Sequence, residues 1–137
     1  MNQIDIKGLH FSYTEKEEIL KGINLVIDER STAIIGQNGA GKTTFVKLLK
    51  GLLRPTQGNI LFNGQDLSGF TAAQLAKDIG LVFQNPNDQI FKNTVIDEVM
   101  FGPLQIGMDS QVAEVSAQKA LAMVGLEGTE KVNPYDL

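Results

Sequence analysis

Cysteine is absent from this 137-residue sequence, and histidine occurs only once, at His10. Without cysteine the chain can form neither a disulfide nor a thiolate metal site. A metal site or a catalytic role built on His10 is also disfavoured, because no second histidine accompanies it. We therefore expect His10 to hold a structural position in a strand.

Long apolar runs and an excess of basic charge are missing as well. No stretch approaches the roughly 18 apolar residues that a membrane-spanning helix needs, and residues 1–5 lack the features of a signal peptide. The net charge of −4 disfavours nucleic acid as a partner. The length and a hydrophobic content of 42% are typical of one soluble domain, so we expect a cytoplasmic protein that meets a membrane only through a partner.

What the sequence does contain is a glycine-rich phosphate-binding pattern. The stretch Gly36-Gln37-Asn38-Gly39-Ala40-Gly41-Lys42-Thr43-Thr44 fits the spacing G-x-x-x-x-G-K-[ST]. The apolar run over residues 32–35 predicts a buried strand before the loop, and one apolar face predicts a helix after it. That face consists of Phe45, Leu48, Leu49 and Leu52. A chance match in a glycine turn is the alternative, but strand, loop and helix follow in the order that a phosphate loop requires.

The residue types in this loop suit phosphate chemistry. Its glycines can adopt backbone angles that a Cβ would forbid, so successive N–H groups can point inward toward phosphate oxygens. The first turn of the helix adds free N–H donors and the positive end of its dipole. Lys42 can reach the β- and γ-phosphates, the Thr43 hydroxyl can bind Mg²⁺, and Thr44 can donate to the α-phosphate.

Strands are predicted from apolar alternation and from short apolar runs. Residues 4–13 and 23–27 alternate, and the polar residues 14–18 between them predict a turn. Residues 59–63 predict a further short strand. The apolar run over residues 79–83 predicts a second buried parallel strand.

Three further helices are predicted from capping residues at their starts and breakers at their ends. They run from the capping box Thr71/Gln74 to about Asp78, from the cap Thr94/Asp97 to Gly102-Pro103, and from about Asp109 to Val124 before Gly125. One face of the last helix consists of Ala113, Ala117, Ala120, Leu121 and Val124.

Two residues outside the loop each have a functional and a structural interpretation. The ring of Tyr13, at the end of the first strand, could stack on a base, but on the sequence alone a strand-end aromatic is favoured. Gln84 follows the run over residues 79–83, and open α/β sheets place ligands beyond the carboxyl ends of their strands. Its amide oxygen could bind Mg²⁺ or orient a water, and an ordinary polar loop residue is an equally good interpretation.

Together these segments resemble the ATP-binding subunit of ABC transporters. The resemblance rests on Phe11-Ser12-Tyr13, on the phosphate loop and on Val82-Phe83-Gln84-Asn85-Pro86. Within that family, residues 87–91, 94–95 and 97–103 are similar to the cobalt/nickel and energy-coupling-factor (vitamin) importer group. This similarity disfavours a soluble ABC ATPase of DNA repair or translation.

The resemblance implies an α/β fold: a P-loop NTPase (ABC ATPase) core with an antiparallel β subdomain and the start of a helical subdomain. It divides the chain into residues 1–31, mainly antiparallel β, residues 32–84, the core up to the glutamine loop, and residues 85–137, the glutamine loop and the start of the helical subdomain. ATP and Mg²⁺ are the implied cofactors, and Tyr13 would stack on adenine, which reverses the preference above. The residues then expected to bind the nucleotide are Tyr13, Asn38, Gly39, Ala40, Gly41, Lys42, Thr43 and Thr44.

The resemblance also assigns Lys42 and Gln84 to catalysis, with Thr43 and Gln84 as metal ligands. The region after Gln84, to about Gly107, would contact a transmembrane subunit. A second ATPase subunit, identical or different, would complete the pair at the cytoplasmic face of the cell membrane. The implied function is transport-coupled ATP hydrolysis that drives uptake of cobalt, nickel or a vitamin.

Three motifs of the family are missing from the printed sequence: a Leu-Ser-Gly-Gly-Gln signature, an apolar strand that ends in Asp-Glu, and a switch histidine. Asp97-Glu98 is better interpreted as part of a helix cap. We therefore expect the N-terminal half of such a domain, which binds ATP without hydrolysing it, because loss of a general base alone costs about 10²–10⁴ in rate. A non-catalytic nucleotide-binding or structural fragment stays open as the alternative.

Overall fold

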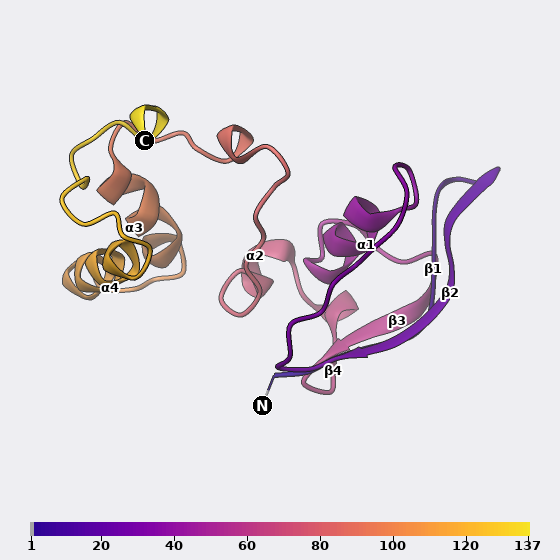
Figure 1. Ribbon diagram of the computed structural model, residues 1–137. Coiled ribbons are helices and arrows are strands. Elements are labelled where there is room, and N and C mark those ends of the chain that lie inside the picture. Colours follow the sequence, from indigo (N-terminus) through magenta and orange to yellow (C-terminus); the bar gives the residue numbers. More distant parts are fainter. Residues whose placement is uncertain (1) are drawn as a thin grey trace. The chain divides into compact units, whose positions relative to one another are not determined.

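The computed structural model describes residues 2–137, which divide into one compact unit up to Gly80 and a second from Leu81 to Leu137. The first unit contains β1 (Ile4–Thr14), β2 (Glu17–Ile27), α1 (Lys42–Leu49), β3 (Gln57–Phe62), β4 (Gln65–Asp66), the 3₁₀ helix η1 (Leu67–Gly69) and α2 (Ala72–Leu75). The second contains η2 (Pro86–Asp88), α3 (Val95–Gln105), α4 (Ser110–Met123) and η3 (Pro134–Asp136) (Figure 1).

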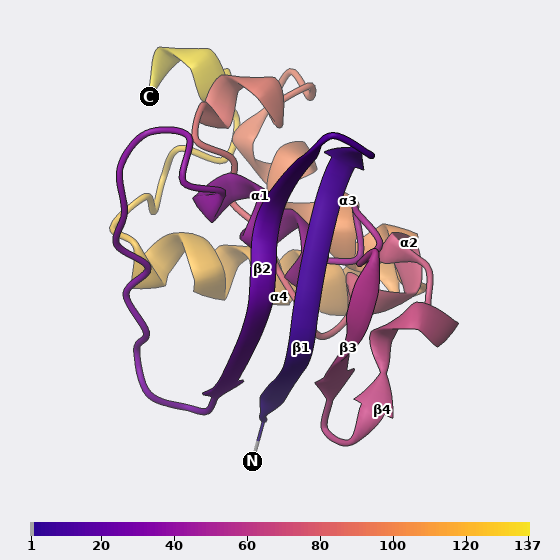
Figure 2. The ribbon, with the colours of Figure 1, turned by 90° about the vertical axis from the view of Figure 1, so that its right-hand side faces the viewer.

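An antiparallel sheet of order β2-β1-β3-β4 forms the body of the first unit. β1 and β2 make one long hairpin, which is paired as far as Thr14 opposite Glu17 (Figure 2). The predicted polar turn is therefore too long, because cross-strand pairing leaves only Glu15 and Lys16 between the two strands. At the other side of the sheet, Asn63-Gly64 joins β3 to β4 with φ values of 50° and 82°.

The core of the first unit lies between the sheet and α1, which covers one face of the strands (Figures 1 and 2). Its buried residues are Ile6, Leu9, Phe11, Leu20, Phe45, Leu48, Ile60, Leu67 and Leu75. Each large apolar side chain buried here contributes about 1.5–3 kcal/mol. Phe45 and Leu48 confirm the predicted face of α1, whereas Leu52 lies beyond the helix and is 45% exposed. This packing fixes the N-terminus of α1 relative to the hairpin.

The two predicted parallel strands do not form. Residues 32–35 and residues 79–83 carry no strand pairing within the described part of the chain, and Ile35 is 93% exposed. A parallel strand needs a strand beside it and cover on both faces. The described strands pair only with one another, in antiparallel fashion. An apolar run without such a neighbour gains no ladder hydrogen bonds, so composition alone does not make it a strand.

The predicted helix starts are confirmed, but the predicted ends of α2 and α3 are wrong. α2 ends at Leu75 and not near Asp78. Thr71 and Gln74 form the capping box of α2, in which the Thr71 N–H donates to Gln74 Oε1 at 2.8 Å. The Thr94 side chain caps α3 by accepting from the N–H of Asp97. α3 then continues through Gly102-Pro103 to Gln105. An interior proline lacks an N–H donor and its ring crowds the preceding turn. The turn after Pro103 nevertheless closes, because the N–H groups of Ile106 and Met108 donate to the carbonyls of Gly102 at 3.2 Å and Pro103 at 3.0 Å.

α4 begins at its predicted cap, where the Asp109 side chain accepts from two backbone N–H groups. The face of α4 that is buried is narrower than predicted and consists of Ala113, Ala117 and Leu121. Ala120 is exposed, because it lies one position before Leu121 and therefore points about 100° away from the buried stripe. Val124 is exposed as well, as the C-cap residue beyond the end of the helix. Gly125, with φ of 74°, ends the helix as expected.

Candidate phosphate-binding site

The glycine loop lies in the connection between β2 and α1 and bends through left-handed glycines. Gly39 and Gly41 have φ values of 82° and 93°, which other residues rarely adopt. Gly41 is the N-cap of α1, and the Ala40 N–H donates to the carbonyl oxygen of Gln37 at 3.2 Å. Gly36 contributes close packing instead, since a Cβ there would lie 3.2 Å from the Cβ of Ala40. The loop therefore turns tightly into the start of the helix.

The N-terminus of α1 is open to a ligand. Within residues 2–137, no side chain caps it and no acidic residue lies in its first turn. The first helical hydrogen bond runs from the Phe45 N–H to the Gly41 carbonyl at 2.8 Å, so the preceding N–H groups have no carbonyl of this helix to bond. These donors and the positive end of the helix dipole favour an anion at this position.

Lys42 is folded back over the loop. Its Nζ donates to the carbonyl oxygens of Gly36 at 2.7 Å and Gln37 at 2.8 Å. An ammonium group has three donors, so these two bonds leave one for a further acceptor. The side chain is thus held with its positive charge at the first two residues of the glycine loop.

The two threonines after Lys42 differ in their surroundings. Thr43 is exposed, whereas Thr44 is buried, with 7% of its surface accessible. Thr44 Oγ1 lies 3.2 Å from the hydroxyl oxygen of Tyr13. The Tyr13 ring packs against Phe11 in a T-shaped arrangement, with centroids 4.8 Å apart, and still remains 59% exposed. The structure therefore brings Tyr13 to the phosphate loop and leaves part of its ring open.

Packing of the hairpin on the loop is a feature that sequence reasoning missed. A Cβ at Gly41 would lie 2.9 Å from Ile19 Cγ2 and 3.0 Å from Leu20 Cδ2, both on β2. No spacing rule relates these residues, because the register of β1 against β2 sets which side chains face the loop. The Tyr13–Thr44 contact was missed for the same reason.

Gln84 is exposed and belongs to the second unit, so its pairing with Thr43 at a metal stays a prediction. Gln89, five residues after Gln84, bonds to the backbone just before it. Its side chain donates to the Leu81 carbonyl at 2.9 Å and accepts from the Phe83 N–H at 2.8 Å. Among the described residues, no group of three or more His, Cys, Asp or Glu could hold a metal ion.

His10 lies in β1, where its Nδ1 is 2.5 Å from Glu18 Oε1, on β2. The predicted strand position of this histidine is therefore confirmed. Within residues 2–137, no helix combines the length and the apolar character that a membrane-spanning segment requires.

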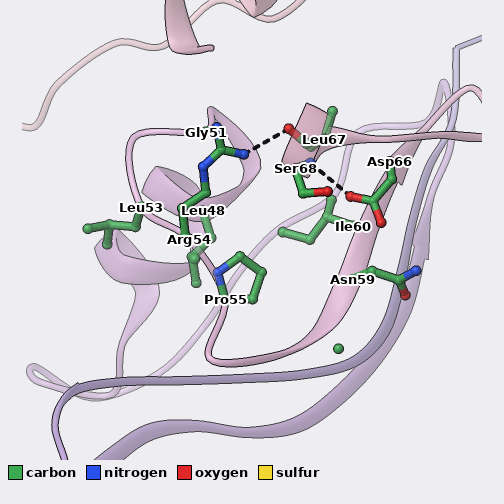
Figure 3. A pocket seen from close by; sticks show the side chains of 11 residues that line it. Leu48, Gly51, Leu53, Arg54, Pro55, Asn59, Ile60, Asp66, Leu67 and Ser68 are labelled. Carbon is green, nitrogen blue, oxygen red and sulfur yellow. Dashed lines mark hydrogen bonds between the residues drawn. The ribbon is translucent and has the colours of Figure 1, made fainter. Parts of the chain in front are cut away.

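A pocket of about 170 Å³ lies at the opposite end of α1 from the loop (Figure 3). Its charged side chains are engaged with the backbone. Arg54 donates to the carbonyls of Leu67 at 3.0 Å and Phe70 at 2.6 Å, and Asp66 accepts from the Ser68 N–H at 2.8 Å. Since eight helical residues span about 12 Å, this pocket is separate from the phosphate loop.

Comparisons with known proteins identify the family of the chain. The chain belongs to the ABC transporter family, whose sequence pattern matches residues 20–136. Its fold is that of the ABC ATPases, which confirms the resemblance drawn from the motifs.

Among its relatives, the energy-coupling factor transporter ATP-binding protein EcfA of Methanocaldococcus jannaschii is 39% identical over 137 residues, which cover 98% of this chain and 49% of that protein. Among solved structures, the chain is similar to cbiO1 from Clostridium perfringens, which is part of the ABC transporter complex cbiONQ. The two superpose with a TM-score of 0.86 and are 31% identical, and the match covers 98% of this chain and 55% of that one.

A second solved structure is a dimeric ATP-binding cassette in a post-hydrolysis state bound to ADP and Pi. It has a TM-score of 0.80 and 25% identity, covering 98% of this chain and 62% of that one. The chain spans about half the length of the curated relatives it matches, as the 49% share of the archaeal EcfA illustrates.

Proposed function

We propose that this chain binds Mg-ATP as part of the ATP-binding component of an ABC importer. The observation that carries the proposal is the open N-terminus of α1 behind left-handed glycines, with the Lys42 ammonium held on the carbonyls of the same loop. The loop N–H groups from Asn38 through Gly39, Ala40 and Gly41 to Thr44 would receive the phosphates. Lys42 would contact the β- and γ-phosphates, and the open part of the Tyr13 ring would stack on adenine.

Mg²⁺ would be bound through phosphate oxygens together with the Thr43 hydroxyl and the Gln84 amide oxygen. Mg²⁺ takes oxygen ligands and keeps several waters, so a nucleotide-borne ion needs only one or two protein groups. The exposed Thr43 at the first turn of α1 fits that requirement. When bound, the ion neutralises charge that develops on the β- and γ-oxygens.

Transport-coupled hydrolysis is the activity we propose for the longer ATPase to which such a chain corresponds, with Lys42 and Gln84 among its catalytic residues. Residues 1–137 by themselves would bind ATP without turning it over. Lys42 and the loop can clamp the phosphates, but neither Thr43 nor Gln84 can deprotonate a water. Binding that is not stronger in the transition state gives no rate.

The second unit carries an apolar surface that we propose as the contact for a transmembrane subunit. Phe91, 57% exposed, packs T-shaped on Phe101 with centroids 4.7 Å apart. Lys92 Nζ lies 5.2 Å and 4.9 Å from the centroids of the two rings. Glu98 Oε2 accepts from the N–H groups of Phe91 and Lys92 at 3.0 Å and 2.7 Å, which holds this loop on α3.

Through that contact the protein would sit at the cytoplasmic face of the cell membrane, with a second ATPase subunit beside it. The names of the relatives support an importer, since one is an energy-coupling factor protein and another is part of the complex cbiONQ. The dimeric state of the cassette with ADP and Pi supports a paired ATPase. Uptake of cobalt, nickel or a vitamin is the substrate class we propose.

Calorimetry with Mg-ATP on the parent, Lys42→Ala and Lys47→Ala tests the nucleotide site. A charge-assisted hydrogen bond contributes about 1.5–3 kcal/mol, so Lys42→Ala should weaken binding about tenfold to a hundredfold. Lys47 lies in the last turn of the same helix, and its loss removes the same charge away from the loop. Equal affinities for the parent and Lys42→Ala would refute the proposal.

The membrane contact is tested by expressing the chain in its source cells and measuring its partition between membrane and soluble fractions. Phe91→Ser should move the chain to the soluble fraction without changing ATP affinity. Val115→Ser is the matched control, because Val115 is 51% exposed on α4 of the same unit. A membrane fraction unchanged by Phe91→Ser would contradict the assigned surface.

A further inference from the structure

A contact between Tyr13 and Thr44 joins the two ends of the proposed nucleotide site. The residues are 31 positions apart in sequence, and their hydroxyl oxygens lie 3.2 Å apart. Tyr13 stands where stacking on a base is expected, and Thr44 stands in the first turn of α1, beside the phosphate loop. Stacking needs only the ring of Tyr13, so it gives the hydroxyl group no role.

We propose that the Tyr13 hydroxyl is a positioning group for phosphate binding, which donates to Thr44 Oγ1 and leaves the Thr44 hydrogen for a phosphate oxygen. This inference rests on the nucleotide site proposed above. A hydroxyl has one donor and two acceptor positions, so Thr44 can accept from Tyr13 and donate to a phosphate at the same time. A hydrogen bond to an anionic phosphate oxygen is stronger than one to a neutral hydroxyl. Thr44 should therefore donate its hydrogen to the phosphate and accept from Tyr13, not the reverse.

The surroundings of both residues make the pair well defined. Thr44 is buried, and a threonine in a helix divides between two rotamers because its hydroxyl can also bond a carbonyl in the preceding turn. Tyr13 is itself held by its T-shaped packing on Phe11. Its hydroxyl therefore favours the Thr44 rotamer that is observed over a rotamer bonded back to the helix.

The two roles of Tyr13 predict different responses to a ligand without a base. Stacking acts only on a nucleotide, whereas a hydroxyl that acts through Thr44 also acts on inorganic tripolyphosphate. Hydrogen bonds in a chain strengthen one another, so loss of the Tyr13 hydroxyl should weaken the onward bond from Thr44 as well. Tyr13→Phe separates the roles, because it keeps the ring and removes only the hydroxyl.

The experiment is calorimetric titration of the 137-residue chain with Mg-ATP and with Mg-tripolyphosphate. For Tyr13→Phe we expect both affinities to fall by about the same factor, roughly threefold to tenfold, the usual value of one neutral hydrogen bond. Tyr135→Phe is the control: Tyr135 is 57% exposed, similar to Tyr13, and its hydroxyl donates to the Ile90 carbonyl at 2.8 Å. This control should leave both affinities unchanged.

A double-mutant cycle separates positioning from a general effect on folding. In a Thr44→Val background, Tyr13→Phe should have no further effect, because the acceptor of its bond is gone. Thr44→Ser keeps the hydroxyl and should restore the sensitivity to Tyr13→Phe. Additive effects of Tyr13→Phe and Thr44→Val would overturn the proposal, as would an unchanged tripolyphosphate affinity in Tyr13→Phe.

The outcomes also separate this inference from the proposed function. If the parent binds both ligands and Tyr13→Phe binds them equally well, the positioning role alone is wrong. If the folded parent binds neither ATP nor tripolyphosphate, the nucleotide site and the positioning role fail together. Far-ultraviolet circular dichroism and the unfolding midpoint of each variant establish that it is folded.

Discussion

Alanine at Gly41, compared with alanine at Gly39, measures how much the packing of the β1–β2 hairpin stabilises the phosphate loop. Both glycines have positive φ, at 93° and 82°, so both substitutions carry a backbone penalty of about 1–2 kcal/mol. At Gly39 nothing lies within 4 Å of a new Cβ. At Gly41 the Cβ would meet Ile19 Cγ2 at 2.9 Å and Leu20 Cδ2 at 3.0 Å, and such overpacking costs about 1–3 kcal/mol more.

The assay is urea unfolding of the parent and the two variants, followed by circular dichroism. We expect the free energy of unfolding to fall by about 1–2 kcal/mol in Gly39→Ala and by about 2–5 kcal/mol in Gly41→Ala. Ile19→Ala placed in the Gly41→Ala background should recover part of the difference. Equal losses in the two glycine variants would refute the view that β2 packs against the loop.

Three further changes test the sheet and the caps by unfolding measurements. Gly58→Ala should lower the free energy of unfolding by more than about 2 kcal/mol, because the new Cβ would lie 2.1 Å from the Gly8 carbonyl oxygen. A loss no larger than that of Gly39→Ala would contradict this close approach of β3 to β1. Thr71→Ala should lower the unfolding free energy by about 1 kcal/mol through loss of the α2 capping box, and an unchanged midpoint would count against it. The carboxylate of Asp66 accepts from the backbone N–H of Ser68, which lowers the pKa of Asp66 below its usual value. The ionised carboxylate should therefore stabilise the fold at neutral pH, and this stabilisation should disappear as the pH falls below about 4. Asp66→Asn lacks this group, so the unfolding free energy of the variant should change less over the same pH range.

Local signals in the sequence predicted local structure correctly. The capping pair Thr71/Gln74 forms, and so does the cap at Thr94, because each side chain bonds to backbone three residues away and needs no distant partner. The glycine spacing likewise placed the left-handed turn and the start of α1. In the candidate site, the same local pattern was sufficient to predict that Lys42 begins the helix and that the N-terminus of this helix is open.

Features that depend on distant partners were not predictable in this way. The apolar run over residues 32–35 predicted a strand, but a strand requires a neighbour that no local pattern guarantees. Pro103 predicted a helix end, yet the bonds of the next turn carry α3 to Gln105. The contact of Tyr13 with Thr44 depends on the register of β1 and on the place of α1 against the sheet, which become visible only in the folded chain.

The two carbonyl bonds that hold Lys42 have a consequence for the entropy of binding. A free lysine side chain loses about 1.5–2 kcal/mol of conformational free energy when it is immobilised. The Gly36 and Gln37 carbonyls already fix the Lys42 rotamers before any ligand arrives. The loss of side-chain entropy therefore occurs on folding and does not reduce the free energy of binding. A phosphate therefore meets an ammonium group that is ordered in advance, and more of the electrostatic attraction remains as affinity.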